Sequence, residues 1–257
     1  MAIAAHPDDI EFLMAGTLRR LAEAGWQTHY HTIANGSCGS LTLGAAATAR
    51  WRAGEAREAA RVLGARFHPS LTADCTILYG LPLLRRVAAI VRAVAPHVLL
   101  VPSPQDYMED HTETCRLAVT AAFVRGMPNF RTTPSRRPVS TDVTIYHAMP
   151  HGLRDPLRGR IVPGAFVDTS PVHEIKRHAL AAHRSQDRFL AGTQHMSSYL
   201  REMDEMSREV GSMSGAFVHA EGWRRHLHRG LCAADADPLA DALGDAYLVN
   251  SAVAAGL

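Results

Sequence analysis

Apolar residues recur along this chain with two different spacings. Short, largely apolar stretches at 1–5, 28–34 and 98–101 are typical of strands, and the last of them, VLLV, is continuous enough to be buried on both faces. Between them, apolar positions repeat every three or four residues, as in amphipathic helices. This spacing predicts helices at 16–24, 49–63, 82–94 and 112–124. Because strands and helices alternate, we expect an α/β fold: a Rossmann-like, wound, mostly parallel sheet with helices on both faces.

The second half of the chain is expected to complete this sheet. The same patterns predict strands at 143–147, 165–168 and 216–220, and helices at 171–190 and 196–210. From Gly230 the chain becomes rich in Ala and Asp, and Leu239, Leu243 and Tyr247 are spaced four residues apart, which predicts an amphipathic helix. We therefore divide the chain into an α/β domain, 1–229, and a helical tail, 230–257, packed on that domain.

Composition narrows the class of protein. The chain has 257 residues, of which 47% are hydrophobic, enough to bury a large core without disulfides. Its 4 cysteines form no C-x-x-C pair, which is typical of reduced thiols in a cytoplasmic protein. A net charge of +2 gives no strong field for nucleic acid, and no apolar run approaches the ~20 residues that cross a bilayer. We expect a cytoplasmic protein with no nucleic-acid partner and no stable membrane insertion; a homo-oligomer is compatible with the sequence.

The residues best suited to chemistry follow the first predicted strand, in His6-Pro7-Asp8-Asp9. Ligands of wound α/β sheets bind just beyond the carboxyl ends of the strands, so these side chains lie where a site is expected. Pro7 restricts the backbone, which favours convergence of His6 and Asp9 while Asp8 projects in another direction. One carboxylate can then ligate a metal, and the other remains free as a base.

A third metal ligand is expected from another strand end. His111 closes the polar segment 106–111, which follows the strand at 98–101. With His6 and Asp9 it would make three protein ligands and leave a water position open, as catalytic zinc requires. Taken singly, an Asp pair is usually a helix cap and a lone His usually has a structural hydrogen bond. The prediction therefore depends on the combination.

The sequence resembles the zinc-dependent N-acetylglucosaminyl deacetylase family, the LmbE-like or PIG-L-type de-N-acetylases, from about Ala2 to Arg225. The family's opening motif, His-Pro-Asp-Asp-x-Glu, is present as HPDDIE and is followed by AGTL. Three further motifs of the family follow in the same order: the Arg-x-x-Glu helix as Arg52 to Glu55; Asp-x-Ser, Lys and His-x-Ser-Gln as Asp168 to Ser170, Lys176 and His183 to Gln186; and Ala-Glu-Gly as Ala220 to Gly222.

The resemblance implies a role for each matching residue. His6, Asp9 and His111 correspond to the metal ligands, Asp8 to the general base, and Arg52 to an arginine that contacts substrate. One departure stands in the second motif, which reads His-Pro-Asp-His in many relatives and Met108-Glu109-Asp110-His111 here. The missing first histidine stabilises the reaction intermediate in those relatives. The metal, Tyr107 or a histidine from elsewhere must replace it, and His183 is our candidate catalytic histidine. We also expect Tyr107, like Arg52, to contact substrate.

The function that the resemblance implies is removal of an N-acetyl group from a small-molecule conjugate of N-acetylglucosamine, with Zn²⁺ as cofactor. Three alternatives stay open: a zinc amidase of the same fold that cleaves a different N-acyl group, a metal-binding relative without activity, and a non-catalytic nucleotide-binding module. The last should carry G-x-G-x-x-G in its first strand-to-helix turn. Here that turn carries carboxylates, which would repel a pyrophosphate.

Overall fold

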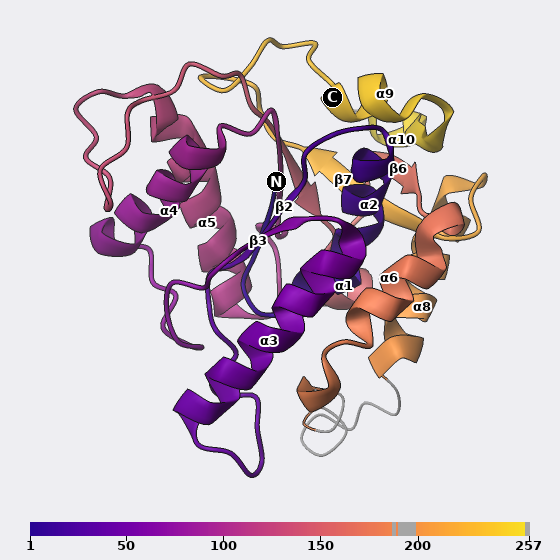
Figure 1. Cartoon of the computed structure of the whole chain (residues 1–257). Helices are drawn as coiled ribbons and strands as arrows, with labels where there is room; N and C mark the ends of the chain where they lie inside the picture. Colours follow the sequence, from indigo (N-terminus) through magenta and orange to yellow (C-terminus); the bar gives the residue numbers. More distant parts are fainter. Residues whose placement is uncertain (187–188, 190–198, 255–257) are drawn as a thin grey trace.

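The computed structural model describes residues 1–186, 189 and 199–254, and its centre is an eight-stranded sheet (Figure 1). The strands are β1 (Ala2–Ala4), β2 (His29–Thr32), β3 (Arg66–His68), β4 (Val98–Val101), β5 (Thr144–Ala148), β6 (Ala165–Asp168), β7 (Ala220–Arg225) and β8 (Tyr247–Val249). Their order is β3-β2-β1-β4-β5-β7-β6-β8. The first five strands in this order pair in parallel, and the pairs β5–β7, β7–β6 and β6–β8 are antiparallel. The expected wound, mostly parallel α/β sheet is confirmed.

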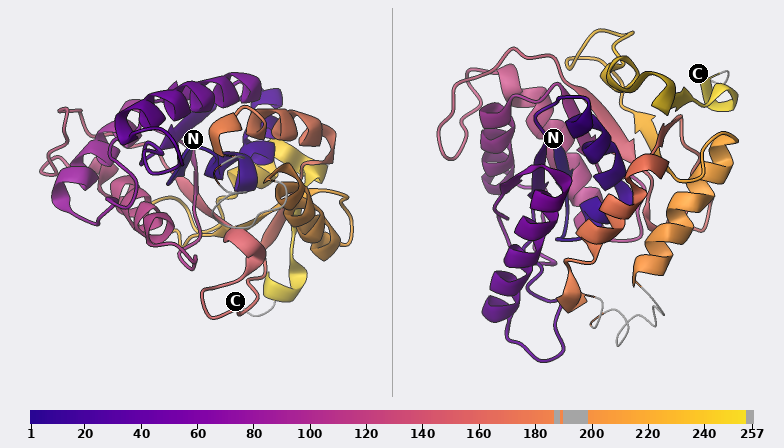
Figure 2. Two further views of the ribbon diagram at one scale, coloured as in Figure 1. Left: turned by 90° about the horizontal axis from the view of Figure 1, so that it is seen from below. Right: turned by 45° about the vertical axis from the view of Figure 1, so that its right-hand side comes forward.

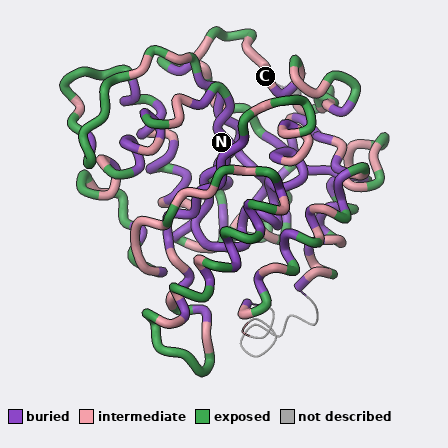
Figure 3. Tube along the Cα trace, viewed as in Figure 1, coloured by how far each residue is buried: buried purple, intermediate pink, exposed green. Residues whose placement is uncertain are grey.

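Helices cover both faces of this sheet (Figure 2). They are α1 (Asp9–Leu13), α2 (Ala15–Glu23), α3 (Ala45–Leu63), α4 (Leu81–Val94), α5 (Glu109–Phe123), α6 (His173–Leu180), α8 (Tyr199–Ser214), α9 (Pro238–Leu243) and α10 (Ser251–Ala254). Strand β4 shows how the two faces separate, because its side chains alternate. Leu100 joins the core under α2, α3, α6 and α8, whereas Leu99 joins the core under α4 and α5. Both cores are buried, and exposed residues lie on the outer surfaces (Figure 3).

A buried ion pair links β7 to α6, and the same glutamate binds the first turn of α2. Glu221 accepts hydrogen bonds from the backbone N–H groups of Gly16 (2.8 Å) and Thr17 (2.7 Å), and from Nζ of Lys176 (2.7 Å). Lys176 is 0% and Glu221 3% exposed. Gly16 is required at this point, because a Cβ there would lie 2.3 Å from a methyl carbon of Thr169. The motif residues Lys176 and Glu221 are therefore structural.

The predicted elements are wrong at several points. The strand expected at 216–220 instead runs from Ala220 to Arg225, and α1 and β3 were not expected. In the tail, the helix ends at Leu243 before Gly244, and Tyr247 begins an edge strand that pairs with β6. The helix predicted at 171–190 is too long, because α6 ends at Leu180 and residues 181–183 are not helical; the helix predicted at 196–210 corresponds to α8. Residues 187–188, 190 and 196–198 of these predictions lie outside the described residues.

The division of the chain at 229/230 stays a prediction. Within the described residues, no helix combines the length and the apolar character that crossing a bilayer requires.

Candidate metal centre and active site

The candidate site lies where the sheet changes direction of winding. Chain connections run from β1 to β2 and β3 on one side, and β4 and β5 follow on the other side of β1. A crevice opens at such a point beyond the carboxyl ends of the two central strands. His6 follows β1 directly, and His111 lies in the first turn of α5, the helix after β4. The topology thus joins two histidines that are far apart in sequence.

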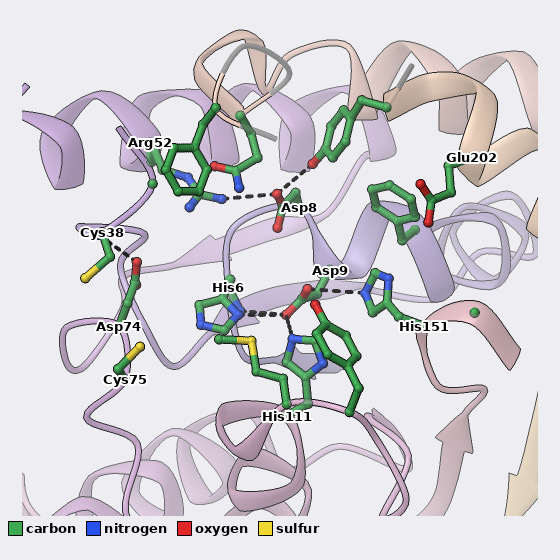
Figure 4. Close-up of a pocket in the computed structure, with 18 residues that line it drawn as sticks. His6, Asp8, Asp9, Cys38, Arg52, Asp74, Cys75, His111, His151 and Glu202 are labelled. Carbon is green, nitrogen blue, oxygen red and sulfur yellow. Dashed lines mark hydrogen bonds and ion pairs between the residues drawn. The ribbon is translucent and has the colours of Figure 1, made fainter. Parts of the chain in front are cut away.

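Three side chains converge in this crevice (Figure 4). Ligand atoms of His6, Asp9 and His111 all lie within 4.8 Å of one another. Oδ2 of Asp9 is 3.5 Å from Nδ1 of His6 and 3.5 Å from Nε2 of His111. These donors are the nitrogen and oxygen atoms that zinc prefers in sites with an open water position. Among the described residues, this is the single compact group of His, Cys, Asp and Glu of this kind.

A carboxylate behind each imidazole fixes its orientation. Nε2 of His6 donates to Oδ2 of Asp110 (2.9 Å), and Nδ1 of His111 donates to Oδ1 of Asp106 (2.9 Å). Each histidine therefore turns its other nitrogen toward Asp9. Carboxylate partners of this kind set the tautomer and raise the basicity of metal-binding histidines. The arrangement fits a divalent cation.

The pKa values of His6 and Asp9 also favour a cation at this position. Burial disfavours protonated His6, but its contacts with Asp110 and Asp9 outweigh burial and raise its pKa to about 10. Burial opposes ionisation of Asp9, yet His111, His151 and His6 lower the pKa of this carboxyl well below its usual range. The site thus favours positive charge beside Asp9, and a metal cation bound there would displace protons.

Asp8 is held apart from this group. It precedes α1 with φ 115°, a left-handed backbone that non-glycine residues rarely adopt. This backbone turns its carboxylate away from Asp9 and toward α3 and α8 (Figure 4). Oδ2 of Asp8 accepts hydrogen bonds from Tyr199 Oη (2.6 Å) and from Nη2 of Arg52 (3.2 Å). Because both donors use one oxygen, the other oxygen keeps its acceptor capacity.

Arg52 is buried and lines the same pocket. Besides Asp8, its Nη2 donates to the carbonyl oxygen of Pro7. Gly36 makes room for it: φ is +75°, and a Cβ there would lie 2.5 Å from Cδ of Arg52. The guanidinium therefore braces the turn that carries Asp8.

The structure brings Tyr107 to the pocket but not His183. Tyr107 is 60% exposed, and its ring stands edge-on to His111 at 5.6 Å between centroids. His183 is buried behind Glu11, with Nε2 3.4 Å from Oε1 of that residue, and it does not line the pocket. Burial disfavours protonated His183, but Glu11 outweighs it and raises the pKa of the imidazole.

No sequence pattern singled out His151, which lines the pocket. Nε2 of His151 is 3.5 Å from Oδ1 of Asp9, and its ring lies against those of His111 and Phe12, at 5.4 and 5.2 Å between centroids. Its place in the site follows from β5, which pairs in parallel with β4, and this pairing has no signal in the sequence near 151. Tyr199 was also missed from the sequence, because no motif near position 199 indicates that it contacts Asp8.

These residues line a pocket of about 760 Å³. Its acidic and aromatic lining residues include Asp74, Glu202, Phe189 and Tyr199. Arg52 is the one Lys or Arg among the described lining residues. A cavity of this size suits a small-molecule ligand.

The fold and the site together define a wound α/β protein with a His₂Asp group at the switch point that could hold a metal ion, and with the Asp8 carboxylate beside it. Residues 1–123 match the family model described as PIG-L: GlcNAc-PI de-N-acetylase. The resemblance that the motifs indicate, to the PIG-L-type de-N-acetylases, is thereby confirmed.

The chain is also similar to individual proteins and solved structures. The chain is 26% identical over 193 residues to the diacetylchitobiose deacetylase of Thermococcus kodakarensis. The matched region covers 72% of this chain and 69% of that protein. The N,N'-diacetylchitobiose deacetylase structure from Pyrococcus horikoshii has a TM-score of 0.71 at 24% identity, covering 88% and 82% of the two chains. The 4-carboxy-2-hydroxymuconate hydratase from Pseudomonas putida has a TM-score of 0.72 at 22% identity, covering 87% and 94%. These two structural likenesses show the shared fold.

Proposed function

We propose that this protein is a zinc-dependent hydrolase that removes an N-acetyl group from a small N-acetylglucosamine conjugate. One observation carries the proposal: His6, Asp9 and His111 converge as a ligand set, and Asp8 stands beside them with an oxygen free to accept a proton. The likeness to a diacetylchitobiose deacetylase supports the amide substrate and the amino sugar. The 4 free cysteines support the expected cytoplasmic location.

In this proposal, His6, Asp9 and His111 would hold the cation, and Asp8 transfers protons. A zinc ion held by His6, Asp9 and His111 would supply Lewis acidity and would make water a stronger nucleophile near neutral pH. Asp8 accepts a proton as the water oxygen bonds to the amide carbon, and then delivers it to the nitrogen as the C–N bond breaks. Tyr199 and Arg52 hold the Asp8 carboxylate in place for both transfers. The products are acetate and a free amino sugar.

The remaining pocket residues would bind the sugar. Arg52 and Tyr107 reach the pocket from opposite sides of the crevice, on α3 and before α5, and we propose that both contact substrate. The exposed ring of Tyr107 offers an apolar face on which a sugar ring can stack. We place His183 behind the site, where it orients Glu11 and contacts no substrate atom.

The structural likeness to a hydratase suggests a second candidate, addition of water to a carbon–carbon double bond. Its carboxylate-rich substrate would need several cationic partners. The pocket here offers Arg52, which already faces Asp8, and it also carries Asp74 and Glu202. Like charges repel strongly in a partly buried site, so the deacetylase is favoured. An amidase for a longer N-acyl group remains the alternative within hydrolases.

The test measures the carboxylate released by the zinc-loaded protein: acetate from N-acetylglucosamine and N,N'-diacetylchitobiose, and butyrate from the matching N-butyryl compounds. We expect Asp8→Asn to keep zinc and lose about 10²-fold or more in kcat, the usual contribution of a general base. His111→Ala should lose zinc, and His178→Ala, an exposed histidine on α6, should match the wild type. No acetate from any compound, or full zinc and full activity in His111→Ala, would overturn the proposal.

A further inference from the structure

The second motif leaves the pocket without one expected donor. Met108 stands directly before α5 and lines the pocket, and its thioether has no hydrogen to donate. Yet a carbonyl oxygen that gains negative charge during hydrolysis needs hydrogen-bond donors placed in advance. A donor must therefore come from another part of the wall.

His151 is placed to supply it. It lies in a short turn, His151–Leu153, that follows the carboxyl end of β5, and Gly152 and Leu153 there have positive φ values of 70° and 56°. This turn directs the imidazole into the crevice between the rings of Phe12, Tyr107 and His111, with centroid distances of 5.2, 6.1 and 5.4 Å. Three aromatic neighbours fix one orientation of the ring.

The two oxygens of Asp9 separate His151 from the ligand set. Oδ2 faces His6 and His111, whereas Oδ1 faces His151 (Figure 4). The ring of His151 thus borders the cation position on the side away from His6. Its Nε2 is 3.5 Å from Oδ1, too long for a good hydrogen bond, and has no other hydrogen-bond partner in the described part of the chain. This nitrogen is buried, and the Asp9 oxygen that faces it lies at the long limit of a hydrogen bond, so Nε2 can still donate to a substrate oxygen.

We propose that His151 is a catalytic residue that donates a hydrogen bond to the carbonyl oxygen of the amide as that oxygen becomes negative. It takes the place of the histidine that Met108 replaces, from a different loop. The inference rests on the proposed deacetylase function. No proton needs to leave His151 during the cycle, because Asp8 carries the proton from water to the amine.

This role differs from two others that the same position allows. A fourth metal ligand would make His151→Ala lose zinc. A residue that only packs against Phe12 would change stability and leave the chemical step intact. A donor to the negative oxygen affects binding of a tetrahedral, negatively charged mimic and leaves binding of the amine product unchanged.

The experiment compares wild type, His151→Ala, His151→Gln and the control His178→Ala. It measures zinc content, kcat and KM for N,N'-diacetylchitobiose, and Kd for glucosamine and for its N-methylphosphonyl derivative. We expect His151→Ala to keep zinc and KM, to lose about 10²- to 10³-fold in kcat, and to bind the phosphonyl compound at least about tenfold more weakly. His151→Gln, which keeps an N–H, should recover part of both losses.

Two results would overturn the inference: loss of zinc from His151→Ala, or an unchanged Kd for the phosphonyl compound despite lower activity. Failure of the proposed function itself is distinguishable, because then wild type and His178→Ala would also release no acetate.

Discussion

The buried pair of Lys176 and Glu221 makes a prediction about stability that does not depend on the reaction. Glu221 accepts three hydrogen bonds, from Lys176 Nζ and from the N–H groups of Gly16 and Thr17. In Glu221→Gln the amide keeps the size of the side chain but loses the charge, and its NH₂ group must face a donor. Lys176, 0% exposed, is left as an uncompensated buried charge.

Breaking one partner of a buried ion pair costs about 3–5 kcal/mol. This is a large part of the total stability of an ordinary domain, about 5–15 kcal/mol. We therefore expect Glu221→Gln to lower the free energy of unfolding by about 3 kcal/mol or more. The double variant Lys176→Met, Glu221→Gln should recover part of the loss, because no unpaired charge remains.

Urea unfolding followed by circular dichroism measures both values, with Arg201→Gln on the surface of α8 as a control for loss of an exposed charge. The reasoning fails if Glu221→Gln loses less than about 1 kcal/mol, the scale of an ordinary surface pair. It also fails if the double variant is less stable than Glu221→Gln.

Other predictions follow from single sites. Burial lowers the pKa of His31 from 6.5 to about 3. Between pH 3 and pH 6.5, His31 is therefore protonated in the unfolded chain and neutral in the folded chain. The free energy of unfolding should fall as the pH drops below 6.5, by about 1.4 kcal/mol per pH unit from this group. In His31→Leu, urea unfolding at several pH values should show a dependence of this free energy on pH that is weaker by that amount. Removing zinc with a chelator should lower the unfolding temperature, and free zinc at 100 times its Kd should restore about 2.7 kcal/mol; equal melting curves with and without zinc would contradict this. Gly36→Ala should displace Arg52 and raise KM for the acetylated sugar several-fold, whereas Gly215→Ala, with φ +67° and open space around it, should leave KM unchanged.

The parallel half of the fold was predictable because its signals are local. Apolar stretches mark β1, β2 and β4, and strand ends in a wound sheet share one edge, so His6 and His111 could be placed together before any coordinates. Asp8 and Asp9 could be separated in direction by their position in the turn. The convergence of the three ligand side chains agrees with that expectation, and their role as ligands stays a proposal.

The antiparallel half was harder because its decisive contacts are distant in sequence. Strand β7 begins with Ala220, Glu221 and Gly222, and a glutamate does not signal a buried strand unless its lysine partner is known. The position of His151 depends on β5 lying next to β4, a pairing that no pattern near 151 reveals. Tyr199 reaches Asp8 from 191 residues away along the chain.

The winding of the sheet assigns the proposed cation ligands and most of the pocket wall to different parts of the chain. In the described part of the chain, the three proposed ligands come from two connections, those after β1 and β4, whereas much of the surrounding wall comes from other loops and from α3 and α8. Substitutions in that wall, apart from those at Arg52, His151 and Tyr199, can therefore alter which molecule is accepted while the proposed ligand set stays intact. A fold arranged in this way can diversify in substrate range without rebuilding its reactive centre.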